Sequence, residues 1–176
     1  MEEHRKIFKI ASILLQYPEQ EWIGDEQLFH EISSLSNESV RKLFMQFLDY
    51  LTTNEIETLC EIYVNTFDFS DKTTMYLTYH LFGDQKERGQ AFLKLKEEFR
   101  NAGFDLLDEE LPDYLPVVLE FASVAPEEHA KKMLLIHKTT IDKIAEELKL
   151  ANNPYYLVMN GCVTGIVAFL EEKKAS

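Results

Sequence analysis

The sequence predicts an all-α protein, a single-domain bundle of about eight to ten helices over residues 1–176. Apolar residues recur three to four positions apart along most of the chain, which is the spacing of one helix face. No segment alternates apolar and polar residues convincingly, and no hairpin turn is evident. The 176 residues include only 6 Gly and 5 Pro, too few for a turn-rich β fold, and this length fits one domain.

Three helices are expected in the first 51 residues. Residues 7–15 form an apolar stripe that ends at Tyr17, because a residue that precedes proline avoids the helical region. Asp25 is expected to cap the second helix and Asn37 the third, since both side chains can accept from the free N–H groups of a first turn.

The middle of the chain is expected to be helical as well. Asn54 and Glu57 resemble a capping box that opens a helix over residues 56–67. Residues 74–82 are apolar or aromatic nearly all round, which predicts a central helix.

Gly83 is expected to end that central helix. Asp84 and Glu87 then form a second cap pair for the helix that follows. That helix carries its apolar stripe over residues 91–102, and Gly103 can terminate it in the left-handed region.

The last third of the chain predicts an acidic loop followed by three helices. The loop covers residues 104–112, and the first helix covers residues 114–124. Pro126 suits the first position of the next helix, and Asn153 is expected to cap the last one, a buried core helix. Close helix packing is expected at two glycines of that last helix, Gly161 and Gly165.

The charge balance excludes one class of partner. The chain has 18 basic and 31 acidic residues, a net charge of −13, and so repels the phosphates of nucleic acids. It attracts cationic peptides instead. No run of apolar residues is long enough for a membrane span, so no stable membrane association is expected. The two cysteines, Cys60 and Cys162, are too few for a disulfide framework and fit a reducing cytoplasm.

No enzyme, metal or cofactor motif is found, so no metal or cofactor is expected. The residues point to no nucleophile and to no paired acid and base, although a helical enzyme stays possible in principle. None of the five histidines has a glutamate three residues before it, which excludes a ferritin-like di-iron site. There is no HExxH motif, no phosphate-binding glycine loop and no nucleophile elbow. His137 lies on the apolar face of its helix and is interpreted as a hydrogen-bonded core residue.

Three segments depart from a plain core pattern: residues 63–69, 77–89 and 110–121. They combine aromatic residues with carboxylates, which suits a groove for an amphipathic basic helix. The expected peptide-binding residues are Tyr63, Phe67, Tyr76, Tyr79, Asp84, Glu110, Pro112, Asp113 and Tyr114.

These segments also carry a family resemblance. The strings FDF, LTYHLFGD, KERG and ELPDYLPVVLEF resemble the NarJ-type nitrate reductase assembly chaperones, as does ASILLQYPEQEW near the N-terminus. That group is part of the redox enzyme maturation chaperones, with the TorD and DmsD types. The resemblance implies a TorD-like helical fold and a non-catalytic cytoplasmic chaperone.

The implied partner is the apo catalytic subunit of a respiratory nitrate reductase. The chaperone would bind the N-terminal segment of that subunit and keep it from the membrane while the molybdenum cofactor and iron–sulfur cluster are inserted.

The peptide-binding motifs of the wider family are matched in part. Its Pro-Asp-His stretch is matched by Pro112 and Asp113, with Tyr114 at the histidine position. Its Tyr-x-x-Leu-Phe motif is matched by Tyr63 and Phe67. We expect Asp113 to accept a hydrogen bond from a peptide Lys or Arg.

Two other functions stay open from the residues alone. One is a helical nucleotide- or cofactor-binding protein, and the other is a structural interaction subunit of a redox complex. The sequence also leaves open whether the chain is a monomer or a dimer.

Overall fold

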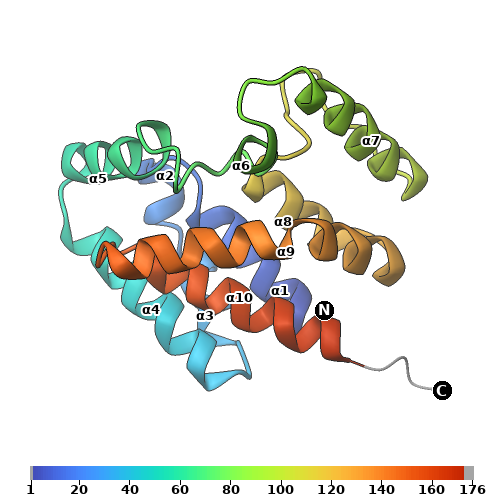
Figure 1. Ribbon diagram of the computed structural model, residues 1–176. Helices are drawn as coiled ribbons and strands as arrows, with labels where there is room; N and C mark the ends of the chain where they lie inside the picture. Colours follow the sequence, from blue (N-terminus) through green and yellow to red (C-terminus); the bar gives the residue numbers. More distant parts are fainter. Residues whose placement is uncertain (1, 173–176) are drawn as a thin grey trace.

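The computed structural model describes residues 2–172, and these form ten α-helices and one π-helical turn (Figure 1). An all-α bundle within the predicted number of helices is therefore confirmed. The helices are α1 (Glu3–Leu14), α2 (Gln20–Ile23), α3 (Glu26–Ser33), α4 (Glu38–Thr53), α5 (Ile56–Tyr63), η1 (Val64–Asp68), α6 (Tyr79–Phe82), α7 (Glu87–Asn101), α8 (Leu115–Val124), α9 (Glu127–Leu150) and α10 (Tyr156–Glu171).

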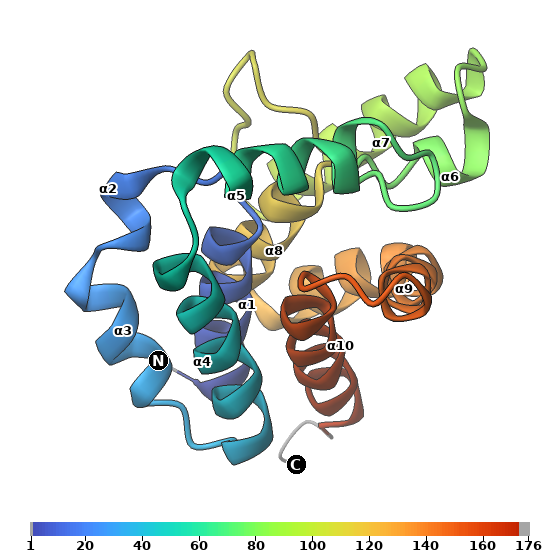
Figure 2. The same ribbon diagram turned by 90° about the vertical axis from the view of Figure 1, so that its left-hand side faces the viewer.

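The core of the bundle is built on α1 and α10. Helix α1 packs on α8 and α10, while α10 also packs on α4 and α9, so five helices share one apolar interior. Helices α6 and α7 project from this body on one side, as both views show (Figures 1 and 2).

Two glycines let α10 approach its neighbours closely, as the sequence predicts. A Cβ atom at Gly161 would lie 2.5 Å from the Phe44 ring of α4. A Cβ atom at Gly165 would lie 2.7 Å from Ile7 of α1. Side chains at these positions would push the helices apart, so glycine is required by packing.

Several predicted helix ends are confirmed by their hydrogen bonds. The Asp25 carboxylate accepts from the Gln27 N–H, and the Asn37 side chain accepts from the Val40 N–H. Gly103 has φ +89° directly after α7. Pro126 lies one residue before its predicted position, as the N-cap of α9.

Two predicted caps are wrong. Helix α5 begins after Glu55, and the Asn54 side chain instead donates to the Tyr50 carbonyl at the end of α4 (2.7 Å). Helix α7 begins at Glu87 after Lys86, with no side-chain cap, so Asp84 does not start it.

The predicted central helix over residues 74–82 is also wrong, because only Tyr79–Phe82 is helical. Burial alternates before it: Met75 and Leu77 are buried and Tyr76 is exposed, which is the pattern of extended chain. This stretch forms an isolated antiparallel bridge between Tyr76 and Tyr114. The Leu77 N–H donates to the Asp113 carbonyl, and the Leu115 N–H to the Met75 carbonyl.

Candidate functional site

The bridge between Tyr76 and Tyr114 organises a buried polar cluster around Asp113. Asp113 has no exposed surface, and its Oδ2 atom accepts from the Thr78 N–H (3.0 Å) and the Thr78 hydroxyl (2.6 Å). The Arg88 guanidinium lies 3.6 Å from the same oxygen and donates from Nε to the Thr78 hydroxyl. Asp113, Thr78 and Arg88, called here the Asp113 cluster, tie α7 to the start of α8.

Arg88 is held by aromatic rings as well as by charge. Its guanidinium carbon lies 5.7 Å from the centre of the Tyr79 ring and 5.1 Å from that of Phe92. A cation of the chain itself therefore occupies the place beside Asp113 that we expected a peptide cation to take. A direct peptide contact at Asp113 stays a prediction, and it would require Arg88 to move.

A chain of tyrosines leads from the core to the surface beside this cluster. The Tyr63 hydroxyl donates to the Leu15 carbonyl and lies 3.0 Å from the Tyr114 hydroxyl. The Tyr114 ring stacks on Tyr76, with ring centres 5.1 Å apart. Burial raises the pKa of both Tyr63 and Tyr114.

Two residues expected to line the groove lie in the core instead. Tyr63 and Phe67 are 4% and 3% exposed, and Phe67 packs edge-on against both Tyr63 and Tyr155. The π-helical turn that follows α5 buries Phe67 in this aromatic core. Tyr63 therefore supports Tyr114 from behind, and Phe67 packs against Tyr63, so neither residue lines an open surface.

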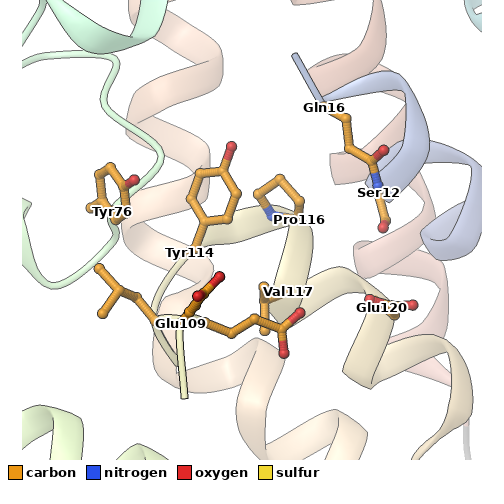
Figure 3. A pocket seen from close by; sticks show the side chains of 10 residues that line it. Ser12, Gln16, Tyr76, Glu109, Tyr114, Pro116, Val117 and Glu120 are labelled. Atoms are coloured by element: carbon orange, nitrogen blue, oxygen red, sulfur yellow. The ribbon is translucent and has the colours of Figure 1, made fainter. Parts of the chain in front are cut away.

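An open pocket of about 360 Å³ lies in front of the stacked tyrosines (Figure 3). Three predicted residues line it: Tyr76, Glu110 and Tyr114. Four more lining residues lie in the predicted 110–121 segment but were not among the expected binding residues: Leu111, Pro116, Val117 and Glu120. The remaining three were not predicted: Ser12, Gln16 and Glu109. We call this the acidic pocket, because Glu109, Glu110 and Glu120 all border it.

Two helices supply the opposite wall of the acidic pocket. Ser12 lies in α1 and Gln16 two residues beyond its end, while Pro116, Val117 and Glu120 come from α8 (Figure 3). Val117 and Glu120 follow Tyr114 in steps of three residues, a helical spacing that could have identified them from the sequence. Nothing in the local sequence marks the α1 residues, since only the packing of α1 on α8 brings them near.

The other predicted residues lie outside the lining of this pocket. Pro112 is buried, Asp84 is exposed and Tyr79 is half-buried beside Arg88. The charges of Asp71 and Asp84 raise the pKa of Tyr79, so these groups share one neighbourhood around α6. The structure therefore divides the predicted set between the acidic pocket, the core and the surface of α6.

A second, mainly apolar groove of about 530 Å³ lies between α6, α7 and α9. Its lining includes Leu81, Leu95, Ile136 and the buried His137. The His137 Nε2 atom has no hydrogen-bond partner among the described residues, so the predicted hydrogen bond is not found at this nitrogen. Burial lowers the pKa of His137 to about 4, opposed by the nearby charge of Asp113.

Residues 2–172 contain no group of three or more His, Cys, Asp or Glu side chains arranged to hold a metal ion. None of their helices combines the length and apolar character that crossing a membrane requires.

Comparison with known proteins adds a family and a fold. The family model described as "Nitrate reductase delta subunit" matches residues 35–156. The chain is 36% identical over 149 residues to the probable nitrate reductase molybdenum cofactor assembly chaperone NarJ of Bacillus subtilis, covering 84% of this chain and 81% of that protein. It is 32% identical over 161 residues to the nitrate reductase-like protein NarX of Mycobacterium tuberculosis, covering 90% of this chain but only 24% of NarX.

The fold is also found in a solved structure. A crystal structure of a redox enzyme maturation protein from Archaeoglobus fulgidus superposes with a TM-score of 0.65 at 20% sequence identity. The match covers 97% of this chain and 94% of that one. At this level of identity the likeness shows a shared helical architecture.

Proposed function

Because the chain belongs to the nitrate reductase delta subunit family, we propose that it is an assembly chaperone for a respiratory nitrate reductase. It binds the N-terminal segment of the apo catalytic subunit in the cytoplasm. It assists insertion of the molybdenum cofactor into that subunit before membrane attachment. The cofactor is cargo for the client, and the chaperone itself carries out no catalytic step.

The acidic pocket is the observation that carries this proposal. Stacked aromatic rings at its centre and three glutamates at its border match a segment with apolar anchors and basic residues. The net charge of −13 favours the approach of such a segment over long distances. Burial of its apolar side chains supplies about 25 cal/mol per Å², less the cost of ordering the segment.

The division of labour within the site follows from burial. Tyr76, 37% exposed, can stack on an incoming side chain, while Tyr114 behind it is fixed by Tyr63. Glu109 and Glu110 offer carboxylates to Lys or Arg at little desolvation cost, since the pocket is open to water. The Asp113 cluster holds the two bridged segments in place.

Calorimetric titration with a synthetic N-terminal segment of the apo catalytic subunit tests the proposal. We expect saturable binding that a scrambled segment does not reproduce. Tyr76→Ala should weaken binding about tenfold, the effect of losing one aromatic anchor. Glu110→Gln should weaken it less, while Glu146→Gln on α9 should leave it unchanged. Equal affinity for the true and scrambled segments would reject the proposal.

A pull-down from cells separates a chaperone from a structural subunit. In cells that lack the molybdenum cofactor, the chain should capture the immature catalytic subunit. After cofactor loading is restored, the complex should dissociate. A complex that persists with the loaded enzyme would identify a structural subunit instead.

A further inference from the structure

Another hollow lies along α1, next to the acidic pocket. It has a volume of about 450 Å³ and is bounded by α1, α2 and α3. Its main lining residues are Lys9, Ile10, Ile13, Gln16, Trp22 and Leu28. We call it the Trp22 hollow.

Trp22 gives this hollow an aromatic wall whose polar group is already satisfied. Its indole N–H donates to the Tyr17 carbonyl (3.0 Å), which fixes α2 against the end of α1. The rest of the half-buried ring is apolar surface. Together with Ile13 and Leu28 it offers contacts to apolar side chains rather than to a polar ligand.

The Trp22 hollow and the acidic pocket are neighbours along α1. Gln16 borders both, and α1 contributes Ser12 to one and Ile13 to the other. From Lys6 to Ile13 the Trp22 hollow follows α1 over about 10 Å.

One ion pair marks the junction between the two cavities. Lys9 lines the Trp22 hollow, Glu120 lines the acidic pocket, and their charged groups lie 3.1 Å apart. Both side chains are about half exposed, so the pair is weak and its lysine can be exchanged for another cation.

We infer that both cavities form one groove along α1 and are filled by a single amphipathic segment of the client. The inference rests on the proposed function and adds the course of the segment. Basic residues of the segment lie over Glu109, Glu110 and Glu120, and its apolar residues continue into the Trp22 hollow. Charge favours this order, because the acidic pocket has three glutamates and no basic residue. The charged residues of the Trp22 hollow balance one another, Lys6 and Lys9 against Asp25 and Glu31, and its apolar side chains lie between them.

Trp22 provides the test, since it is the single tryptophan of the chain. The probe is a synthetic N-terminal segment of the apo catalytic subunit in which any tryptophan is replaced by phenylalanine. We expect Trp22 emission to change and saturate at the concentrations at which calorimetry reports binding. A probe shortened by its apolar half should bind more weakly and leave Trp22 emission unchanged.

A variant pair gives an independent measurement. Trp22→Ala should weaken probe binding about tenfold by calorimetry. Phe29→Ala, which removes an exposed ring from the neighbouring helix α3, should have no effect. If Trp22→Ala does not fold, the emission titration of the unmodified chain still decides.

Three outcomes overturn the inference, and they are distinguishable. Binding in the calorimeter with unchanged Trp22 emission means that the segment ends at the acidic pocket, and the proposed function stands. Emission that depends on protein concentration without any probe means that a second copy of the chain covers the hollow. No binding at all removes both this inference and the proposed function.

Discussion

Glu110 and Asp113 lie three residues apart, yet the fold gives their carboxylates opposite surroundings. Glu110 borders an open pocket, whereas Asp113 is fully buried and accepts three contacts from Thr78 and Arg88. The first can exchange partners with a ligand at little cost, and the second cannot lose its partners without leaving buried groups unsatisfied. Within these four residues, Asp113 therefore stabilises the fold, whereas Glu110 is available at the surface.

Because of this difference, substitutions in the two regions should change different measured quantities. Changes at the Asp113 cluster should appear mainly in the free energy of unfolding, because Asp113 and Thr78 are buried and bond to each other. Changes at the acidic pocket should appear mainly in peptide affinity, because its carboxylates are solvated in the unbound chain.

The largest expected effect belongs to Asp113→Ala. It leaves the Thr78 N–H and hydroxyl without an acceptor and Arg88 without its carboxylate, so the free energy of unfolding should fall by about 3 kcal/mol. Urea denaturation measures this change. Glu110→Gln serves as the matched carboxylate control and should stay within about 0.5 kcal/mol of the unmodified chain. Equal losses of stability in the two variants would contradict the assignment of Asp113 to the fold and of Glu110 to the surface.

His137 is also buried, and it should make the free energy of unfolding depend on pH. Its folded pKa of about 4 lies below the unfolded value of 6.5, so the unfolded chain binds more protons between these pH values. Stability therefore falls as pH drops through this window, with about 2 kcal/mol lost between pH 7 and pH 5 from this group.

His137→Leu isolates that contribution from the carboxylates. The variant should lose less stability between pH 7 and pH 5 than the unmodified chain, as measured by urea denaturation at each pH. His30→Gln, at an exposed histidine, should retain the original pH dependence. An unaltered slope in His137→Leu would show that His137 is not held neutral by burial.

The sequence predicts most of the helical framework because its signals are local. Apolar spacing places α1, and side-chain oxygens at Asp25 and Asn37 cap the helices that follow. The helix predicted over residues 74–82 is wrong for a physical reason. A run that is apolar on both faces fits a buried helix and a buried strand equally well. Here the Thr78 side chain bonds to Asp113, 35 residues away, and this tertiary contact helps to hold the extended form.

The candidate site is predicted less completely because it is assembled across the chain. Tyr76, Glu110 and Tyr114 reach the acidic pocket as expected, but Ser12 and Gln16 arrive there only through helix packing. A carboxylate among aromatic residues, as at Asp113, fits a peptide-binding residue and a buried hydrogen-bond acceptor alike. The burial of Asp113, its bonds from Thr78 and the position of Arg88 on α7 separate the two interpretations.

A pure packing change should perturb stability without touching the pocket. Gly165→Ala places a methyl group 2.7 Å from Ile7 and should cost about 1–2 kcal/mol in urea denaturation. Gly89→Ala in α7 is the matched control, since no atom lies within 4 Å of its added Cβ. That control should stabilise the chain by about 0.5 kcal/mol, because alanine is the better helix former. Calorimetry should show unchanged peptide affinity in both variants, and an altered affinity would couple the core to the pocket.

The smallest expected effect lies at the junction of the two cavities. Lys9→Ala frees Glu120 to meet a basic residue of the client segment, so peptide affinity should rise about two- to threefold in low salt. The gain should shrink as ionic strength increases, because exposed charges are screened. Lys42→Ala is the matched control, since Lys42 forms a similar exposed pair with Glu38 on α4. Weaker binding by Lys9→Ala would mean that the lysine itself contacts the segment. The glutamates of the acidic pocket would then not be the only charged groups that bind it.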